Sequence, residues 1–309
     1  MPDPIYGSAA SIAQLLLLLL IPLELLLASS ARIKAEYDLR DTLANVTVSV
    51  GSIFFWGTLS WIFMGAVYFA YRHRMTTVPF AWWSFLIAFV AEDLRYYWWH
   101  RISHRSRWFW ASHVVHHSSQ HFNLSTNLRQ SWTSQFSGLI LLNVPLAYLG
   151  FHPGTVALAF TVNLLYQFWI HTEAIQRLPN WFEWLLNTPS HHRVHHASNP
   201  RYLDANYAGV LMIWDRLFGS FVPERDEEPV RYGLVHDLAS FNPLRIALHE
   251  YVGIARDQRR RGLSWAQRLG YLFGPPGWSH DGHHRTTAAL RGAPASTQAT
   301  ARSLHAASS

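Results

Sequence analysis

Histidines spaced three and four residues apart constrain this chain more than any other feature of its sequence. One group consists of His100, His104, His113, His116 and His117, and a second consists of His191, His192, His195 and His196. His171 stands alone between the two groups, at the end of an apolar run. Residues three and four apart share one face of an α-helix. We therefore expect each group to present its imidazoles together on a helix face.

Imidazole is the commonest side-chain ligand of transition metals, and several on one helix face can share an ion. Although 19 histidines in 309 residues produce some clusters by chance, two clusters with the same spacing are hard to attribute to chance. The predicted metal ligands are His100, His104, His113, His116, His117, His171, His192, His195 and His196. This set exceeds the four ligands of a structural zinc site, so the sequence predicts two metal ions. The chain has no cysteine, which excludes thiolate sites, iron–sulfur clusters and disulfides.

The composition favours a chain that lies partly in lipid. Half of the residues are apolar, 14% are charged and 15 are Trp, a balance that is typical of membrane proteins. The net charge of +6 comes almost wholly from arginine, since Lys34 is the only lysine. The arginines form no stripe and are interrupted by Trp-rich segments. We therefore expect contacts with anionic lipid headgroups and no nucleic-acid partner.

Apolar stretches predict an all-α fold, an integral membrane helical bundle with about four to five membrane helices. The stretches are Ile12–Ala28, Val46–Tyr71, Val78–Ala91, Gly138–Leu149 and Thr155–Ile170. The second carries no charge and is long enough to cross the bilayer with some tilt. The third continues through an aromatic belt to His100, which places the first histidines near the membrane–water interface. The last two predict a hairpin that enters the membrane and returns to the same side at His171.

The distribution of basic residues predicts the orientation of this multi-pass chain. If the histidine side is cytoplasmic, only Arg72 and Arg74 of the 25 Lys and Arg residues lie outside, as the positive-inside rule requires. The histidine-rich dimetal site then belongs to a cytoplasmic helical cap, to which residues 199–222 contribute. We expect one membrane-embedded domain at residues 1–277 and a disordered tail at residues 278–309, where the sequence is rich in Ala, Ser, Thr and Gly.

The three histidine motifs carry a family resemblance. In order, spacing and membrane context, they resemble the histidine boxes of the fatty acid hydroxylase/sterol desaturase superfamily. The motifs are His100-x-x-x-His104, His113-x-x-His116-His117 and His192-x-x-His195-His196. The resemblance covers about residues 85–235, which we expect to be the catalytic core. Within the superfamily, Glu92-Asp93 with residues 113–119, together with residues 166–173 and 187–196, is most similar to the alkylglycerol monooxygenases.

This resemblance implies a non-haem centre of two iron ions, with O₂ as the oxidant. The implied reaction is hydroxylation or desaturation of a C–H bond in a membrane lipid, such as a fatty acyl, alkylglycerol or sterol-like substrate. Electrons would come from an external donor, either a separate reductase or an electron carrier, and one subfamily suggests a tetrahydropterin. Hydroxylation and desaturation remain alternatives, because sub-ångström positioning decides between them. No feature of the sequence indicates an oligomeric state.

Several other side chains are candidates for additional ligands or for hydrogen bonds to the ligating rings. These are His191, His121, Glu92, Asp93, Glu173, Asp204 and Asp215. Each acid could equally form an interfacial salt bridge with a nearby arginine. The candidates for lining a lipid that enters between the helices are Trp98, Trp99, Trp132 and Phe168. Aromatic residues in such segments more often pack or form the interfacial belt.

Two other classes of function stay open. One is a membrane transporter of zinc or another metal, in which histidines mark the ion path. Transporters place polar ligands near the bilayer midplane, whereas here the apolar stretches are almost free of ionisable residues and the histidines cluster at helix ends. The other class is a non-catalytic metal-binding relative, against which the complete set of histidine motifs argues.

Overall fold

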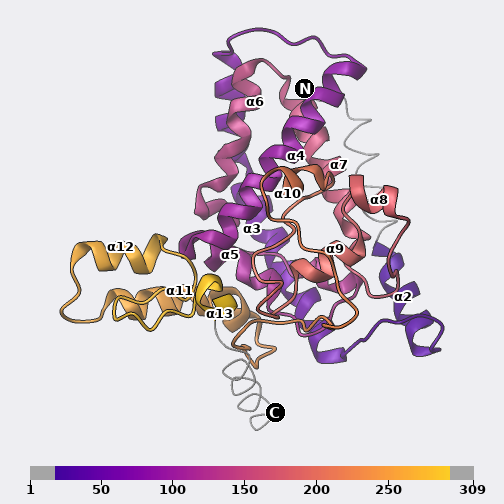
Figure 1. The fold of residues 1–309 in the computed structure, drawn as a ribbon. Helices are drawn as coiled ribbons and strands as arrows, with labels where there is room; N and C mark the ends of the chain where they lie inside the picture. The colour runs from indigo at the N-terminus through magenta and orange to yellow at the C-terminus, as the bar shows by residue number, and fades with distance from the viewer. Residues whose placement is uncertain (1–17, 293–309) are drawn as a thin grey trace.

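The computed structural model describes residues 18–292, and every regular element within them is a helix (Figure 1). The only β feature in that part of the chain is an isolated bridge between Leu186 and Leu211. The all-α prediction is therefore confirmed for these residues. Residues 12–17 of the first predicted span, and 293–309 of the predicted tail, lie outside the described residues.

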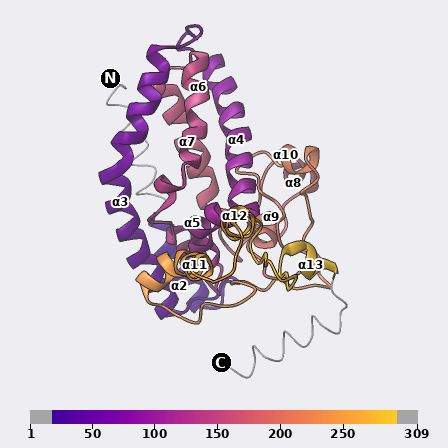
Figure 2. The same cartoon turned by 90° about the vertical axis from the view of Figure 1, so that its left-hand side faces the viewer.

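Four helices stand side by side and form the upper part of the molecule (Figures 1 and 2). They are α3 (Leu39–Arg72), α4 (Trp82–Arg105), α6 (Val144–Leu149) and α7 (Pro153–Phe168). Helix α3 begins where the Asp38 side chain accepts the N–H of Asp41, and α7 begins with a proline at its first position. Helices α4 and α7 pack together through the fully buried Ala88 and Ala159, because small side chains allow close approach.

A backbone contact joins the two connections at the upper end of this bundle. The N–H of Met75 donates to the carbonyl of Tyr148 at 2.8 Å, and that of Val78 donates to Gly150 at 3.1 Å. Gly150 has a φ of +113°, and a Cβ on it would lie 2.3 Å from the carbonyl oxygen of Thr76. Only glycine fits this turn without strain. The predicted hairpin of α6 and α7 is thus joined to the loop between α3 and α4.

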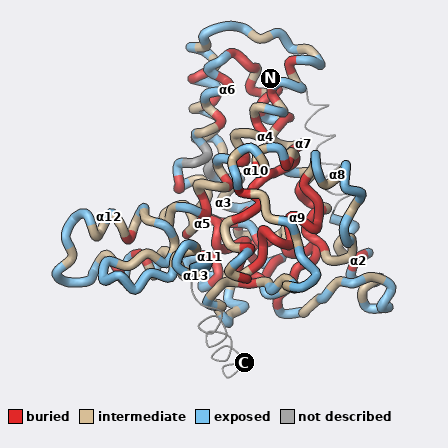
Figure 3. The backbone as a smooth tube through the Cα atoms, viewed as in Figure 1, coloured by how far each residue is buried: buried red, intermediate tan, exposed pale blue. Residues whose placement is uncertain are grey.

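The lower part of the molecule surrounds α5 (Arg107–His117) and α9 (Pro189–His195) and contains much of the buried chain (Figure 3). Its other elements are α2 (Leu20–Ser29), η1 (Leu124–Leu128), η2 (Ser134–Ser137), η3 (Leu139–Asn143), α8 (Asn180–Leu185), α10 (Ile213–Leu217), α11 (Pro243–Gln258), α12 (Trp265–Phe273) and α13 (Thr287–Gly292). Two described features lie in the segment 278–309 that was predicted as a disordered tail. One is α13, and the other is Trp278, whose ring centre lies 5.1 Å from that of Tyr271.

The outer surfaces of α3 and α4 expose large apolar side chains. Trp61 is 70% exposed, Phe69 67% and Trp82 77%. Within residues 18–292, no single helix is both long and apolar enough to cross a membrane, and one bent pair meets the criteria of length and composition together. That pair is Leu39–Thr58 with Ser60–Arg72, which meet at 44° within α3. Exposed apolar surface on this scale marks a face that contacts another apolar phase or partner.

Candidate metal centre

The nine predicted ligands lie together in two buried groups. The first group contains His100, His104, His113, His117 and His195, and the second contains His116, His171, His192 and His196. Within each group, one ring nitrogen from every histidine lies within 4.8 Å of the others. None of these side chains is more than 8% exposed. The histidines of α4 and α5 therefore lie next to those of α9, although the two clusters are far apart in the sequence.

Helix geometry divides the histidine motifs of α5 and α9 between the two groups, whereas His100 and His104 both belong to the first group. On α5, His113 and His117 are one turn apart and belong to the first group, while His116 belongs to the second. On α9 the division is reversed, because His195 belongs to the first group and the pair at 192 and 196 belongs to the second. Residues three and four apart share one face of a helix, but they lie on opposite sides of the residue from which they are counted. The motifs of α5 and α9 can therefore each serve both members of a pair of metal ions.

Backbone carbonyls fix the orientation of several rings. The Nδ1–H of His100 donates to the carbonyl of Tyr207 at 2.8 Å, and that of His195 donates to Ala205 at 2.9 Å. The Nδ1–H of His171 donates to Gln167 at 2.8 Å. A carbonyl only accepts, so Nδ1 of each ring carries the proton and Nε2 presents a bare lone pair. This is the tautomer that a metal ligand coordinating through Nε2 requires.

The Nε2 atoms of the second group face one another at distances that bare lone pairs do not tolerate. The Nε2 of His171 lies 2.8 Å from that of His192 and 3.1 Å from that of His116. The ring of His116 also directs Nδ1 to a carbonyl, that of Arg129 at 3.3 Å. No proton is then available between Nε2 of His171 and Nε2 of His116. Coordination of a metal ion by these histidines would remove the repulsion.

The first group also contains ring nitrogens that lack a hydrogen-bond partner. Among the described residues, the Nε2 atoms of His104 and His195 are buried without a hydrogen-bond partner. The Nε2 atoms of His100 and His113 lie 2.9 Å apart. Leaving buried polar atoms unsatisfied costs about 1–3 kcal/mol each. The donor set therefore fits a metal ion in each group.

Burial also sets the charge of the site. It lowers the pKa of His113, His117 and His196 well below the usual value, and neighbouring histidines lower it further. Burial likewise lowers the pKa of His171 to about 4. The rings are therefore neutral at pH 7, as ligation requires. Because neither group contains a carboxylate, the protein offsets little of the charge that two divalent ions would bring.

Among the predicted acids, Asp204 is the one that reaches a histidine of the groups. Its Oδ1 lies 3.7 Å from Nδ1 of His104, and its Oδ2 lies 3.8 Å from Nε of Arg105. Asp215 acts one step further away, because it accepts the N–H groups of Tyr207 and Ala208, both at 2.8 Å. It therefore holds the loop whose Tyr207 carbonyl orients His100.

The remaining candidates bond to other parts of the protein. Asp93 accepts the N–H groups of Val210 and Leu211, both at 2.9 Å, and the indole N–H of Trp214. Glu92 pairs with Arg95 at 2.5 and 2.8 Å, and Glu173 accepts the hydroxyl of Tyr232. His191 packs against Phe221, and His121 lies 3.8 Å from Glu36. Neither of these two histidines belongs to a group.

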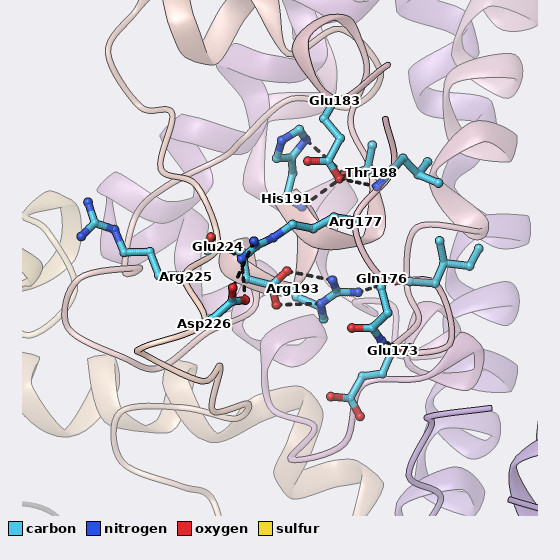
Figure 4. A network of polar contacts seen from close by, with 12 residues as sticks. Glu173, Gln176, Arg177, Glu183, Thr188, His191, Arg193, Glu224, Arg225 and Asp226 are labelled. Atoms are coloured by element: carbon cyan, nitrogen blue, oxygen red, sulfur yellow. Dashed lines mark hydrogen bonds and ion pairs between the residues drawn. The ribbon is translucent and has the colours of Figure 1, made fainter. Parts of the chain in front are cut away.

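Arg193 of α9 holds this helix against two loops (Figure 4). Its guanidinium binds both carboxylate oxygens of Glu224, at 2.8 and 2.9 Å. It also donates to the carbonyls of Thr172 and Ile175. Since Thr172 follows His171, this network ties α9 to the loop that carries the lone histidine. Arg193, which directly follows His192, thus positions the helix that carries three of the predicted ligands.

Glu24 of α2 supports the same loop. This carboxylate is 5% exposed and accepts the N–H of Leu124 at 2.8 Å and the hydroxyl of Tyr37 at 2.5 Å. It also accepts the hydroxyl of Thr172, next to His171. The sequence shows Glu24 only as a charge inside an apolar stretch. Its structural role depends on three partners that are distant along the chain.

An apolar cavity of about 430 Å³ reaches the second group from the helical bundle. It meets the histidines at positions 113, 116 and 171, and its walls include Ile53, Trp56, Phe160 and Leu164. Of the four aromatic candidates, Trp99 and Phe168 line this cavity. Trp98 instead packs against Phe218 at 4.9 Å, and Trp132 donates its indole N–H to the carbonyl of Val48 at 2.8 Å.

Comparison with known proteins identifies the domain that carries this centre. Residues 85–220 match the family model described as fatty acid hydroxylase. That segment of the chain resembles the fatty acid hydroxylase family. It includes all nine histidines of the two groups. The resemblance inferred from the histidine motifs is confirmed.

Curated proteins that are similar to this chain are named alkylglycerol monooxygenase. The chain is 47% identical over 198 residues to alkylglycerol monooxygenase of Danio rerio, covering 64% of this chain and 43% of the relative. It is 39% identical over 269 residues to alkylglycerol monooxygenase of Homo sapiens, covering 84% and 57%. The chain thus spans about half the length of these curated relatives. No solved structure matches the chain.

Proposed function

We propose that this protein is a membrane-bound, non-haem di-iron monooxygenase that uses O₂ to hydroxylate a C–H bond of a lipid. The observation that carries the proposal is the pair of buried histidine groups, in which the Nε2 lone pairs of His171 and His116 face each other without a proton between them. When bound, two iron ions would supply the O₂ chemistry that no protein side chain provides. The names of the relatives favour an ether-linked glycerol lipid as substrate.

The residues of the apolar cavity would orient the lipid. Phe160, Leu164 and Phe168 offer apolar contacts along α7, and the cavity ends at His113, His116 and His171. An acyl or alkyl chain in this space would present its carbon atoms to the metal centre while excluding water. The guanidinium of Arg95, which also lines the cavity, offers hydrogen bonds to a polar group of the lipid.

The bundle of α3, α4, α6 and α7 would lie in the membrane, with the histidine side in the cytoplasm. The exposed apolar side chains of α3 and α4 support this placement. So does the concentration of arginine on the histidine side of the sequence. Lipid would then reach the cavity directly from the bilayer. Electrons would come from an external donor, for which a tetrahydropterin is the candidate that the resemblance offers.

The test combines metal content with lipid-dependent O₂ consumption. The full chain, purified in lipid nanodiscs, should hold about two irons per chain and consume O₂ when an alkylglycerol and a reductant are supplied. His116→Ala should lose metal and activity together, because it removes a ligand of the second group. His73→Ala, at the exposed end of α3, is the matched control and should keep both. Zinc alone in the purified protein, with transport into vesicles, would contradict the proposal.

A further inference from the structure

A second cavity reaches the metal centre from the side opposite the helical bundle. It has a volume of about 420 Å³ and contacts the histidines at positions 104, 117, 195 and 196. The apolar cavity contacts a different set, at 113, 116 and 171. Among the described residues, none lines both cavities. Much of the wall of the second cavity comes from α5, α11, α12, α13 and the segment before α13, which lie below the bundle in Figure 1.

The two cavities differ in the charge of their walls. The only Asp, Glu, Lys or Arg among the described residues that line the apolar cavity is Arg95. The second cavity is lined by six such residues, namely Arg107, Asp204, Glu250, Asp257, Arg260 and Arg285. A lipid chain is poorly suited to a charged wall, since burying charges against it costs their hydration. The second cavity therefore suits a water-soluble molecule.

Ion pairs within the wall narrow the kind of molecule further. Arg107 binds Glu250 and Asp257, both at 2.6 Å, and Arg260 binds Asp257 at 2.9 Å. Arg285 donates to His236 at 2.9 Å. With three acids and three arginines, the wall has no formal net charge. These pairings favour a neutral polar occupant over one that carries phosphate groups, which bind best to unpaired arginines.

Aromatic rings connect the second cavity to the metal ligands. Trp110 lines it, and its ring lies 5.0 Å from that of His104 and 5.5 Å from that of His117. Tyr271 and Trp278 contribute further ring surfaces. Flat side chains of this kind stack on flat ligands. A molecule in this cavity would contact histidines of the first group directly, with Trp110 beside them.

We infer that the second cavity is the binding site of a small, neutral, water-soluble electron donor, separate from the lipid site. This inference rests on the proposed function, which requires such a donor. The balance is RH + O₂ + DH₂ → ROH + H₂O + D, in which the donor DH₂ loses two electrons and two protons. One oxygen atom enters the lipid and the other leaves as water. Separate sites allow the donor and the lipid to be bound at the same time.

The absence of cysteine allows each cavity to be blocked at a single position. Ser279→Cys places a thiol in the second cavity, and Leu165→Cys places one in the apolar cavity. Each full-length variant, in lipid nanodiscs, is modified with a benzyl thiosulfonate. The methyl reagent gives a small adduct at the same position and serves as the matched control.

The readouts are the rate at which hydroquinone, a neutral two-electron donor, reduces the ferric protein without O₂, followed by absorbance, and the Kd of a fluorescent alkylglycerol. The benzyl adduct at 279 should slow reduction by at least about tenfold, a barrier change of about 1.4 kcal/mol, and leave the lipid Kd unchanged. The adduct at 165 should weaken lipid binding and leave the reduction rate unchanged. Equal reduction rates with the benzyl and methyl adducts at 279 would overturn the inference.

Access to the two thiols gives a measurement that does not depend on metal. A charged, membrane-impermeant thiosulfonate should modify Ser279→Cys at least about tenfold faster than Leu165→Cys, since only the former faces the polar cavity. Faster modification at 165 would refute the assignment of the cavities, whatever the metal content. If the thiols behave as expected but the protein holds no reducible metal, the proposed function fails and the donor assignment fails with it.

Discussion

The buried ion pair between Arg129 and Asp41 allows a quantitative test of how α3 is attached to the metal centre. Its two side chains are 1% and 4% exposed, and they meet at 2.7 Å. Arg129 also donates to Asn45 at 2.6 Å and to Ser118 at 3.0 Å. The backbone carbonyl of the same residue accepts Nδ1–H of His116. One residue thus links α3, the end of α5 and a predicted metal ligand.

Arg129→Met leaves the Asp41 carboxylate buried without its cation. Removing one partner of a buried pair costs about 3–5 kcal/mol, which lowers the melting temperature by roughly 5–10 °C for a chain of this size. Arg129→Met combined with Asp41→Leu should recover much of this loss, because both charges are then absent. Thermal unfolding of the metal-free protein in detergent measures all three forms. A single variant within 2 °C of the parent, or a double variant less stable than Arg129→Met, would refute the reasoning.

Three further predictions follow from the site. In the metal-free protein, His171 takes up a proton near pH 6.5 when unfolded but only near its pKa of about 4 when folded. Acidification from pH 7 to 5 should therefore lower the free energy of unfolding by about 2 kcal/mol through this group alone. A melting temperature that does not fall would contradict this. Gly209→Ala places a Cβ 2.7 Å from Asn163 Oδ1 and should cost about 1–3 kcal/mol, whereas Gly57→Ala, with open space in α3, should be neutral or stabilising in the same unfolding assay. Asp215→Asn replaces a carboxylate that accepts two N–H groups by an amide, and should loosen the Tyr207 carbonyl that orients His100. The number of metal ions bound per chain, measured by mass spectrometry, should then drop from two toward one. Full retention of metal would count against this role.

The helices could be predicted from the sequence because apolar content and capping residues act locally. The predicted span Val46–Tyr71 lies within α3, and the predicted stretch Val78–Ala91 overlaps the first part of α4. The segment around α12 carried no comparable signal, although its Ser264 and Gln267 form a capping box. Distances between helices depend on long-range packing. That is why the sequence offered four aromatic lining candidates while two of them contact Phe218 and Val48 instead.

The sequence alone determined the make-up of the candidate metal centre: histidines at helical spacing, no cysteine, and apolar stretches around them. Helical periodicity brings residues three and four apart together whatever the rest of the fold does. Only the tertiary structure decided which imidazole joins which group, and which carbonyls and acids orient the rings. These features arise where separate segments meet, such as the loop of Tyr207 against α4. Contacts of that kind leave no periodic trace in a sequence, because each depends on the relative placement of two distant parts of the chain.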